Sequence, residues 1–423
     1  MSQNTAPAVV MKLPQSFQFS QTVLLKNAAS PSNGTNGTNG ANGKNGTNGT
    51  NGVHSEDVST LATVPLDVLV RFKGTFRGNG FNTIFRPNNT KKPTALKVQP
   101  TDGVKDNILQ LNLTAETMVF SDTFGKKDGL VPNRGVFNQE DIALDGLPYT
   151  QSITDVTENI QGPQPVIHFE TGLWMRVPGS EEPALKPSFA RMASIPHGTT
   201  INAQCFEPAI TKPGAPVIKK IGITPFPIGG GREIHFDSQD ADNQRTHRLP
   251  ENLSDPKFKD RITQEMITNP NVVLTQANKG KTFVDTTTFS ISTEAVGTGL
   301  GGGTSNIGFL AGGKKVAGNA NAAKVTADYW VSKVRTQLEL QPWKPAHKDD
   351  FKKFTPAHDE SAVGVPTFLA REEITEAKTV TVEYTQIQYS QTVILDFATL
   401  SWPHATVATL APVDAELSES LVD

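Results

Sequence analysis

The chain has 423 residues, 36% of them hydrophobic, which is enough to bury a sizeable core. It carries 39 Lys and Arg against 42 Asp and Glu, a formal net charge of -3, so it lacks the basic surplus that nucleic-acid binding needs. Its single cysteine excludes an internal disulfide and a paired-cysteine metal or redox site. No stretch approaches the roughly 18 apolar residues of a membrane span, and the N-terminus lacks the pattern of a secretory signal. We therefore predict a cytoplasmic protein without a nucleic-acid or membrane partner.

The first 56 residues divide into a strand-like segment and a linker. Residues 1–32 contain one alternating apolar pattern, typical of a half-buried strand, and residues 33–56 begin with a period-three Asn-Gly tract that predicts a flexible linker. Residues 15–25 resemble residues 385–395, so we predict that the two segments are a duplication or occupy equivalent places in one sheet. If the N-terminal strand instead completes the sheet of another chain, the protein forms a homo-oligomer.

Between residues 57 and 412, apolar and polar residues alternate in many short runs, with 35 glycines and 29 prolines distributed through the chain as turn residues. Turns are predicted at Asn79-Gly80 and Asp145-Gly146. The pattern predicts an all-β protein with a few short helices, folded as a large antiparallel calycin-like β-barrel that is duplicated or extended. Residues 413–423 are acidic and are predicted to form a free tail.

Three segments depart from the simple alternation. A capping sequence before an apolar helical pattern predicts a short helical insertion near residues 255–268, and a second is predicted near residues 320–334. In the last long apolar run, the apolar residues occupy even positions up to Tyr384 and odd positions from Ile387 onward. This change of phase predicts a β-bulge.

Common catalytic signatures are missing from the sequence. It contains no HExxH, no GxSxG and no GxxxxGK[ST] motif. The glycine-rich stretch at residues 297–303 lacks the lysine of a phosphate-binding loop, so a tight turn between strands is the favoured interpretation.

Three segments together resemble the nitrobindin-like haem-binding β-barrel family. Residues 71–82, RFKGTFRGNGFN, resemble its opening G-x-W-x-G-x-G signature, with Phe76 in place of the tryptophan. Residues 168–179, HFETGLWMRVPG, resemble its F-x-E-x-G-x-W-R strand. Residues 401–410, SWPHATVATL, resemble its closing strand, although the A-T-L lies one residue farther from the histidine than in the family. The three matches cover about a tenth of the chain, and the barrel would be about twice the usual length.

The resemblance implies that haem b is the cofactor and that His404 is the axial ligand of its iron. The rival ligand is His197, which lies in an Ile-Pro-His-Gly turn and has a backbone-bonded turn histidine as its alternative interpretation. Phe76 and Trp174 are candidate walls of the haem pocket, with a place in the barrel core as the alternative. The implied activity is peroxidase-like, or another detoxification of reactive oxygen or nitrogen species, on a small-molecule substrate.

Peroxide chemistry at haem would use a base and a cation beside the iron. His168 shares a strand face with Glu170, so it is a candidate base if that face points inward and half of a surface pair if it points outward. Arg77 and Arg176 are the candidate cations, with a position on the barrel rim as the alternative. A different function also fits the sequence: a metal-free calycin-like carrier of an apolar small molecule, in which His404 is only a residue near a strand end.

Overall fold

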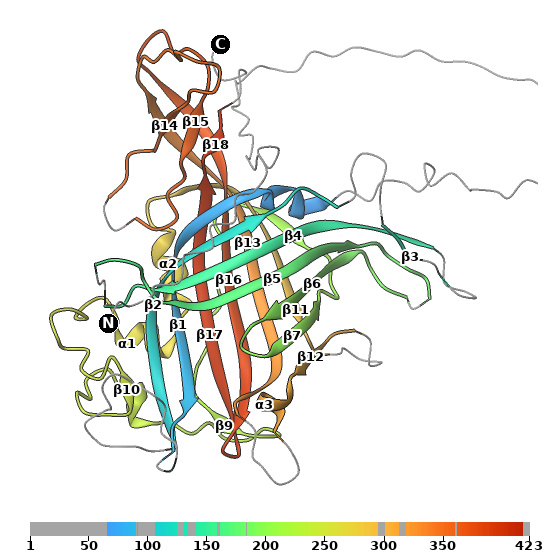
Figure 1. The fold of residues 1–423 in the computed structure, drawn as a ribbon, viewed down its shortest axis with the longest axis vertical. Coiled ribbons are helices and arrows are strands. Elements are labelled where there is room, and N and C mark those ends of the chain that lie inside the picture. Colours follow the sequence, from blue (N-terminus) through green and yellow to red (C-terminus); the bar gives the residue numbers. More distant parts are fainter. Residues whose placement is uncertain are drawn as a thin grey trace, which may run out of the picture.

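The computed structural model describes residues 66–89, 91, 106–124, 131–133, 135, 141–158, 161–182, 184–294, 301–312, 319–359 and 362–417 (Figure 1). The predicted N-terminal strand and Asn-Gly linker lie outside the described residues. So do residues 418–423, the second half of the predicted acidic tail.

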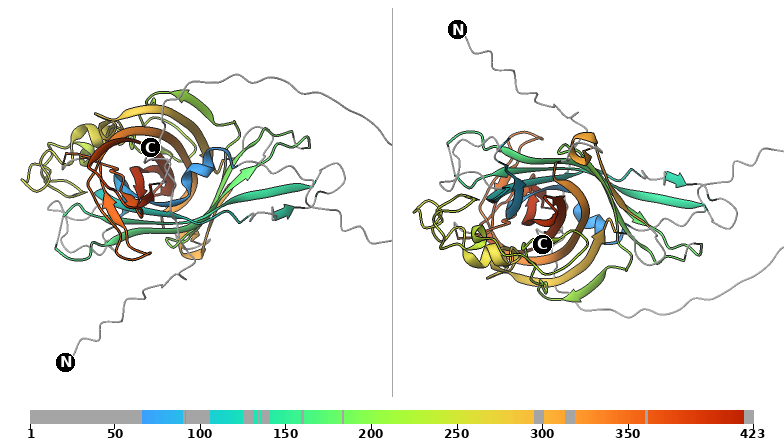
Figure 2. Two further views of the ribbon diagram at one scale, coloured as in Figure 1. Left: turned by 90° about the horizontal axis from the view of Figure 1, so that it is seen from above. Right: turned by 90° about the horizontal axis from the view of Figure 1, so that it is seen from below.

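Ten antiparallel strands of the described chain close into one barrel (Figure 2). They are β1 (Gly74–Pro87), β2 (Asn107–Phe120), β4 (Ile142–Asp155), β5 (Val166–Val177), β6 (Ser188–Ile195), β7 (Thr199–Gln204), β11 (Thr282–Ser292), β13 (Asn321–Leu340), β16 (Lys378–Phe397) and β17 (Leu400–Val413). Their order is β2-β1-β17-β16-β13-β11-β7-β6-β5-β4, and pairing of β4 with β2 closes the ring. The predicted all-β class and antiparallel barrel are confirmed.

Further short elements extend or cover the barrel. The strands are β3 (Val131–Asn133), β8 (Ile210–Pro213), β9 (Phe226–Pro227), β10 (Arg248–Leu249), β12 (Gly303–Asn306), β14 (Lys352–Phe354), β15 (Phe368–Ala370) and β18 (Ala415–Glu416). Among the described residues, the helices are α1 (Gln264–Thr268), α2 (Val272–Ala277), α3 (Gly308–Ala311) and two 3-10 helices, Asp67–Phe72 and Asp237–Gln239. Figure 1 shows β14, β15 and β18 as a small sheet at one end of the barrel, whereas α3 lies near the other end.

Apolar side chains are buried on both faces of the barrel wall. One cluster, which includes Phe76 and Trp174, fills the interior, and a second lies between the outer wall and the segment that carries α1 and α2. A third lies under the small sheet and includes Tyr384. The predicted bulge in β16 is therefore wrong: β16 keeps an unbroken register with β13 from Lys378 to Ile394, and its two faces are buried at different points along the strand.

Two other predictions about local structure are wrong. Residues 320–334 are not helical: from residue 321 onward they belong to β13, in which Val325, Ala327 and Tyr329 alternate into the interior cluster. The predicted tail begins too early, because β18 pairs with β15. Ion pairs help to hold that end of the chain, for example Arg371 Nε with Glu416 Oε1 at 3.0 Å. At the other predicted insertion, 255–268, α1 forms the last five residues and hydrogen-bonded turns precede it.

The predicted Asn-Gly and Asp-Gly turns lie inside strands instead. A Cβ atom on Gly80 would lie 2.0 Å from the carbonyl oxygen of Val407 in β17, and one on Gly146 would lie 2.1 Å from the carbonyl oxygen of Trp174 in β5. These glycines allow neighbouring backbones to approach where the strands curve, a role that does not need a turn. The local dipeptide alone does not distinguish the two cases.

Candidate functional site

A cavity of about 720 Å³ lies inside the barrel, toward the end where α3 lies. Its walls are mainly apolar, with side chains such as Ile153, Ile201 and Val393, and Phe309 of α3 also contributes. Its volume is in the range of cavities that bind small molecules and cofactors. The strand alternation therefore produces an apolar chamber at one end of the barrel and a packed core in the rest of it.

Three histidines line this cavity. His168 points inward from β5, His197 lies in the turn between β6 and β7, and His404 points inward from β17. The rings of His168 and His197 stack with their centroids 5.4 Å apart. Since Glu170 on the same face of β5 is fully buried, the alternative of an exposed surface pair is wrong.

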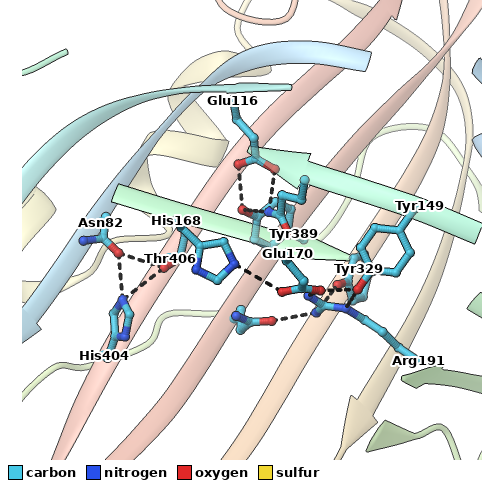
Figure 3. A network of polar contacts seen from close by, with 12 residues as sticks. Asn82, Glu116, Tyr149, His168, Glu170, Arg191, Tyr329, Tyr389, His404 and Thr406 are labelled. Carbon is cyan, nitrogen blue, oxygen red and sulfur yellow. Dashed lines mark hydrogen bonds and ion pairs between the residues drawn. The ribbon is translucent and has the colours of Figure 1, made fainter. Parts of the chain in front are cut away.

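A chain of hydrogen bonds fixes the tautomer of His404. The Asp155 carboxylate only accepts, so the Asn112 amide must direct its Nδ2 toward Asp155 Oδ2 at 2.8 Å. Asn112 Oδ1 then accepts from Asn82 Nδ2 at 3.1 Å. This leaves Asn82 Oδ1 to accept from Thr406 Oγ1 and from His404 Nε2, each at 2.8 Å (Figure 3). His404 therefore carries its proton on Nε2, and Nδ1, which has no hydrogen-bond partner among the described residues, keeps its lone pair.

The surroundings also keep the His404 ring neutral. Burial lowers its pKa from the usual 6.5 to about 3, and the neighbouring His168 and His197 add to this effect. Burial and His168 also lower the pKa of His197. A neutral imidazole with one nitrogen held by an acceptor is the form that ligates metals.

Beside the cavity, a buried ion pair crosses the barrel interior. Arg191 Nη2 lies 2.5 Å from Glu170 Oε1, and the guanidinium also donates to Tyr149 Oη at 2.8 Å, Tyr329 Oη at 2.9 Å and Gln391 Oε1 at 2.6 Å (Figure 3). Although burial opposes ionisation of Glu170, the Arg191 charge lowers its pKa to about 2. The barrel interior therefore contains a permanently charged and hydrogen-bonded network.

The same carboxylate also positions His168. His168 Nε2 lies 3.2 Å from Glu170 Oε2, so the ring is held against the buried network while it lines the cavity. A histidine with one nitrogen fixed by a carboxylate is suited to accept or donate a proton through the other.

A second buried carboxylate, Glu116 of β2, has no ion-pair partner among the described residues. Tyr389 Oη donates to its Oε2 at 2.7 Å, and Gln151 Nε2 donates to its Oε1 at 2.8 Å. Burial is the main reason that the pKa of Glu116 is raised to about 7, and the nearby Glu170 carboxylate raises it further against the two hydrogen bonds. Glu116 is thus a buried group that changes charge near neutral pH.

We expect Glu116 to make the protein less stable as pH rises. Unfolding returns its pKa from about 7 toward 4.5. Between these two values the unfolded chain releases the proton and the folded chain retains it, so the free energy of unfolding falls with rising pH and levels off above pH 7. Denaturant unfolding at a series of pH values should show a smaller fall in Glu116→Gln than in the wild type. Parallel profiles for the two proteins would contradict this assignment.

The arginines singled out by the sequence are not at the cavity. Arg77 of β1 is exposed on the outer face of the barrel. Arg176 donates to the carbonyl oxygens of Val177 and Ser188, at 2.7 and 2.9 Å, and its guanidinium lies over the Phe189 ring. The structure therefore does not bring these two predicted cations together with the histidines, and the rim interpretation describes them better.

The two aromatic candidates belong to the interior core. Phe76 packs edge to face against Phe120, and Trp174 packs in the same way against Tyr329. Neither lines the cavity. Their alternative assignment, as core residues of the barrel, is the one that the packing supports.

Sequence reasoning missed most of the polar residues of the site, and five of them illustrate the reason. They are Asn82, Glu116, Gln151, Arg191 and Tyr389. The alternation carries one usable signal, because each lies on an inward strand face where an apolar residue is expected. Their partners, however, lie on other strands, so sequence spacing does not reveal the contacts.

The described residues contain no group of three or more His, Cys, Asp or Glu that could hold a bare metal ion. None of the described helices has the length and apolar character needed to cross a membrane. Comparison with protein-family models, with curated proteins and with solved structures found no match for this chain. Any functional assignment therefore depends on the geometry of the cavity and on the sequence resemblance stated above.

We expect Asp155 to control the protonation of His404 from a distance. In Asp155→Asn, the new amide can donate to Asn112, which allows both asparagines of the chain to reverse and Asn82 to donate to His404 Nε2. ¹⁵N NMR of the imidazole should then report loss of the pure Nε2–H form. Asp122→Asn, at an exposed aspartate, is the matched control. An unchanged His404 spectrum in Asp155→Asn would show that the carboxylate does not set the tautomer.

Proposed function

We propose that the barrel binds haem b in its cavity, with His404 Nδ1 as the axial ligand of the iron. The observation that carries this proposal is the neutral His404 imidazole, which lines the cavity with Nε2 held by Asn82 and Nδ1 without a described partner. Haem supplies four nitrogen donors of its own and needs only one or two from the protein, which suits a cavity without a three-residue metal cluster. The resemblance to nitrobindin-like barrels supports the same ligand.

The volume and the lining of the cavity support this proposal. Its volume of about 720 Å³ and its apolar walls suit a macrocycle, and Arg86 lies among its lining residues as a cation for acidic groups of the ligand. Bound iron would supply redox or Lewis-acid chemistry. The protein would contribute the His404 nitrogen, an apolar chamber that limits water, and His168 as a group that holds or transfers a proton beside Glu170.

The activity that this arrangement favours is peroxidase-like, or another detoxification of reactive oxygen or nitrogen species. His168 is the residue we assign to proton transfer, because Glu170 orients its ring and the ring lines the cavity. Arg77 and Arg176 have no part in this proposal. The charged group that contacts His168 is instead Glu170, which is paired with Arg191.

The test is a titration of the purified protein with haemin, followed by absorption spectroscopy. A saturable, one-to-one Soret band is the expected result. Iron-free protoporphyrin IX is the matched control, because it has the same apolar body but cannot bind His404 through iron. A haemin spectrum that never departs from that of free haemin would overturn the proposal.

The second candidate function is a metal-free carrier of an apolar small molecule. The apolar walls of the cavity favour it, since Ile153, Ile201 and Val393 contact any ligand regardless of its metal content. This function predicts that protoporphyrin IX, or a neutral dye such as Nile red, binds as tightly as haemin. It also predicts that substitution of His404 leaves that affinity unchanged.

A further inference from the structure

The inner end of the cavity is polar, in contrast to its walls. Three side chains form this cavity floor: Gln151, Tyr389 and Gln391. Gln151 is 3% exposed, and its Nε2 donates to Glu116 Oε1 at 2.8 Å and to Tyr389 Oη at 3.0 Å. The carboxylate therefore fixes the orientation of the amide, and Gln151 Oε1 is left as a buried acceptor without a partner among the described residues.

Gln391 is oriented in the opposite sense by a buried cation. Its Oε1 accepts from Arg191 Nη1 at 2.6 Å, so its Nε2 must point elsewhere. No described residue accepts a hydrogen bond from Gln391 Nε2. The floor therefore offers one unpaired acceptor, on Gln151, and one unpaired donor, on Gln391. The buried, unpaired Gln151 Oε1 is costly unless a ligand or water completes it.

The charges behind the floor disfavour an anion. The buried network contains two carboxylates, Glu116 and Glu170, but only one described guanidinium, Arg191. The remaining titratable groups that face Glu116 are the hydroxyls of Tyr389 and Tyr329, and burial raises the pKa of both. A ligand carboxylate at the floor would meet like charge and could not donate to Gln151.

We propose that the cavity floor is a subsite for an uncharged hydroxyl group of the ligand and that it excludes carboxylates. A hydroxyl can donate to the unpaired Gln151 Oε1, which neither an ether nor a carboxylate can do. Acidic groups of the ligand then remain among the outer lining residues, where Arg86 lies. The inference rests on the proposed role of the cavity as a ligand site, but it does not require that the ligand be haem.

The test is a head-group series with one apolar chain. Nile red, an uncharged dye, is bound first and then displaced at pH 8 by dodecan-1-ol, dodecyl methyl ether or dodecanoate. We expect the alcohol to displace the dye at a roughly ten-fold lower concentration than the ether or the carboxylate, which is the scale of one hydrogen bond to an otherwise unpaired buried group. Equal potency of the three compounds, or a preference for dodecanoate, would overturn the proposal.

Two variants assign the preference to the floor. Gln151→Leu removes the unpaired acceptor, so the advantage of the alcohol over the ether should disappear, whereas Gln337→Leu at an exposed position should retain it. Retention of the advantage in Gln151→Leu would contradict the assignment. If Gln151→Leu does not fold, the wild-type series still decides the question. A further arm lowers the pH below 7, where protonation of Glu116 should weaken the exclusion of dodecanoate.

The outcomes separate this inference from the haem proposal. A preference for the alcohol without a Soret band would retain the subsite and refute haem. A one-to-one Soret band with no preference among head groups would retain the haem proposal and refute the subsite. Absence of both dye binding and haemin binding would refute the cavity as a ligand site, and the subsite with it.

Discussion

Replacement of Arg191 by methionine is expected to reduce the free energy of unfolding by about 3–5 kcal/mol, the usual effect of breaking a buried ion pair. Arg191 is only 2% exposed, and its guanidinium contacts Glu170, two tyrosine hydroxyls and Gln391. Methionine fills a similar volume but leaves the Glu170 charge buried without its cation. Glu170 must then take up a proton or remain as an uncompensated charge.

Urea unfolding measures this effect through a lower midpoint with an unchanged slope. Arg335→Met, which breaks the ion pair with Glu383 on the barrel surface, is the matched control and should cost about 0–1 kcal/mol. Adding Glu170→Gln to Arg191→Met should recover part of the loss, because it removes the unpaired charge. If Arg191→Met costs no more than Arg335→Met, the buried network is not the stabilising element described here.

Substitution of His404 by alanine is expected to abolish the haem Soret band, or to reduce haem affinity by at least about 100-fold, the upper end of the effect of mutations around metal sites. The physical reason is that the His404 ring combines a fixed orientation with a nitrogen that keeps its lone pair. His404 is neutral and oriented by Asn82, whereas the ring of His168 already contacts Glu170 through Nε2. The measurement is the haemin titration, with added imidazole as a test of rescue.

His235→Ala, at an exposed histidine paired with Asp240, is the matched control and should bind haem like the wild type. His197→Ala tests the rival ligand and should lower affinity less than His404→Ala. An unchanged Soret band in His404→Ala together with its loss in His197→Ala would transfer the axial role to His197. Unfolding measured in the absence of haem should separate loss of the ligand from loss of the fold.

For the candidate site, the sequence provided individual residues but not their arrangement. The alternation along β5 places His168 and Glu170 on one face, and the resemblance of the last strand draws attention to His404. It does not show that His168, His197 and His404 surround one cavity, because they come from separate parts of the barrel wall. Arg77 and Arg176 were wrongly expected near the haem because each lies within a recognisable motif. A position within a motif does not indicate which end or face of a strand reaches the cavity.

The sequence by itself determined the all-β class and the antiparallel barrel, because alternation with period two is a local property of the chain that every long strand repeats. Only the tertiary structure decided which faces are covered. β16 illustrates the reason: its register is continuous, but the small sheet covers Tyr384 on one face and the barrel interior encloses Ile387 on the other. The contact of Arg191 with Gln391 likewise joins strands 200 residues apart, so closure of the barrel, and not local sequence, creates the site.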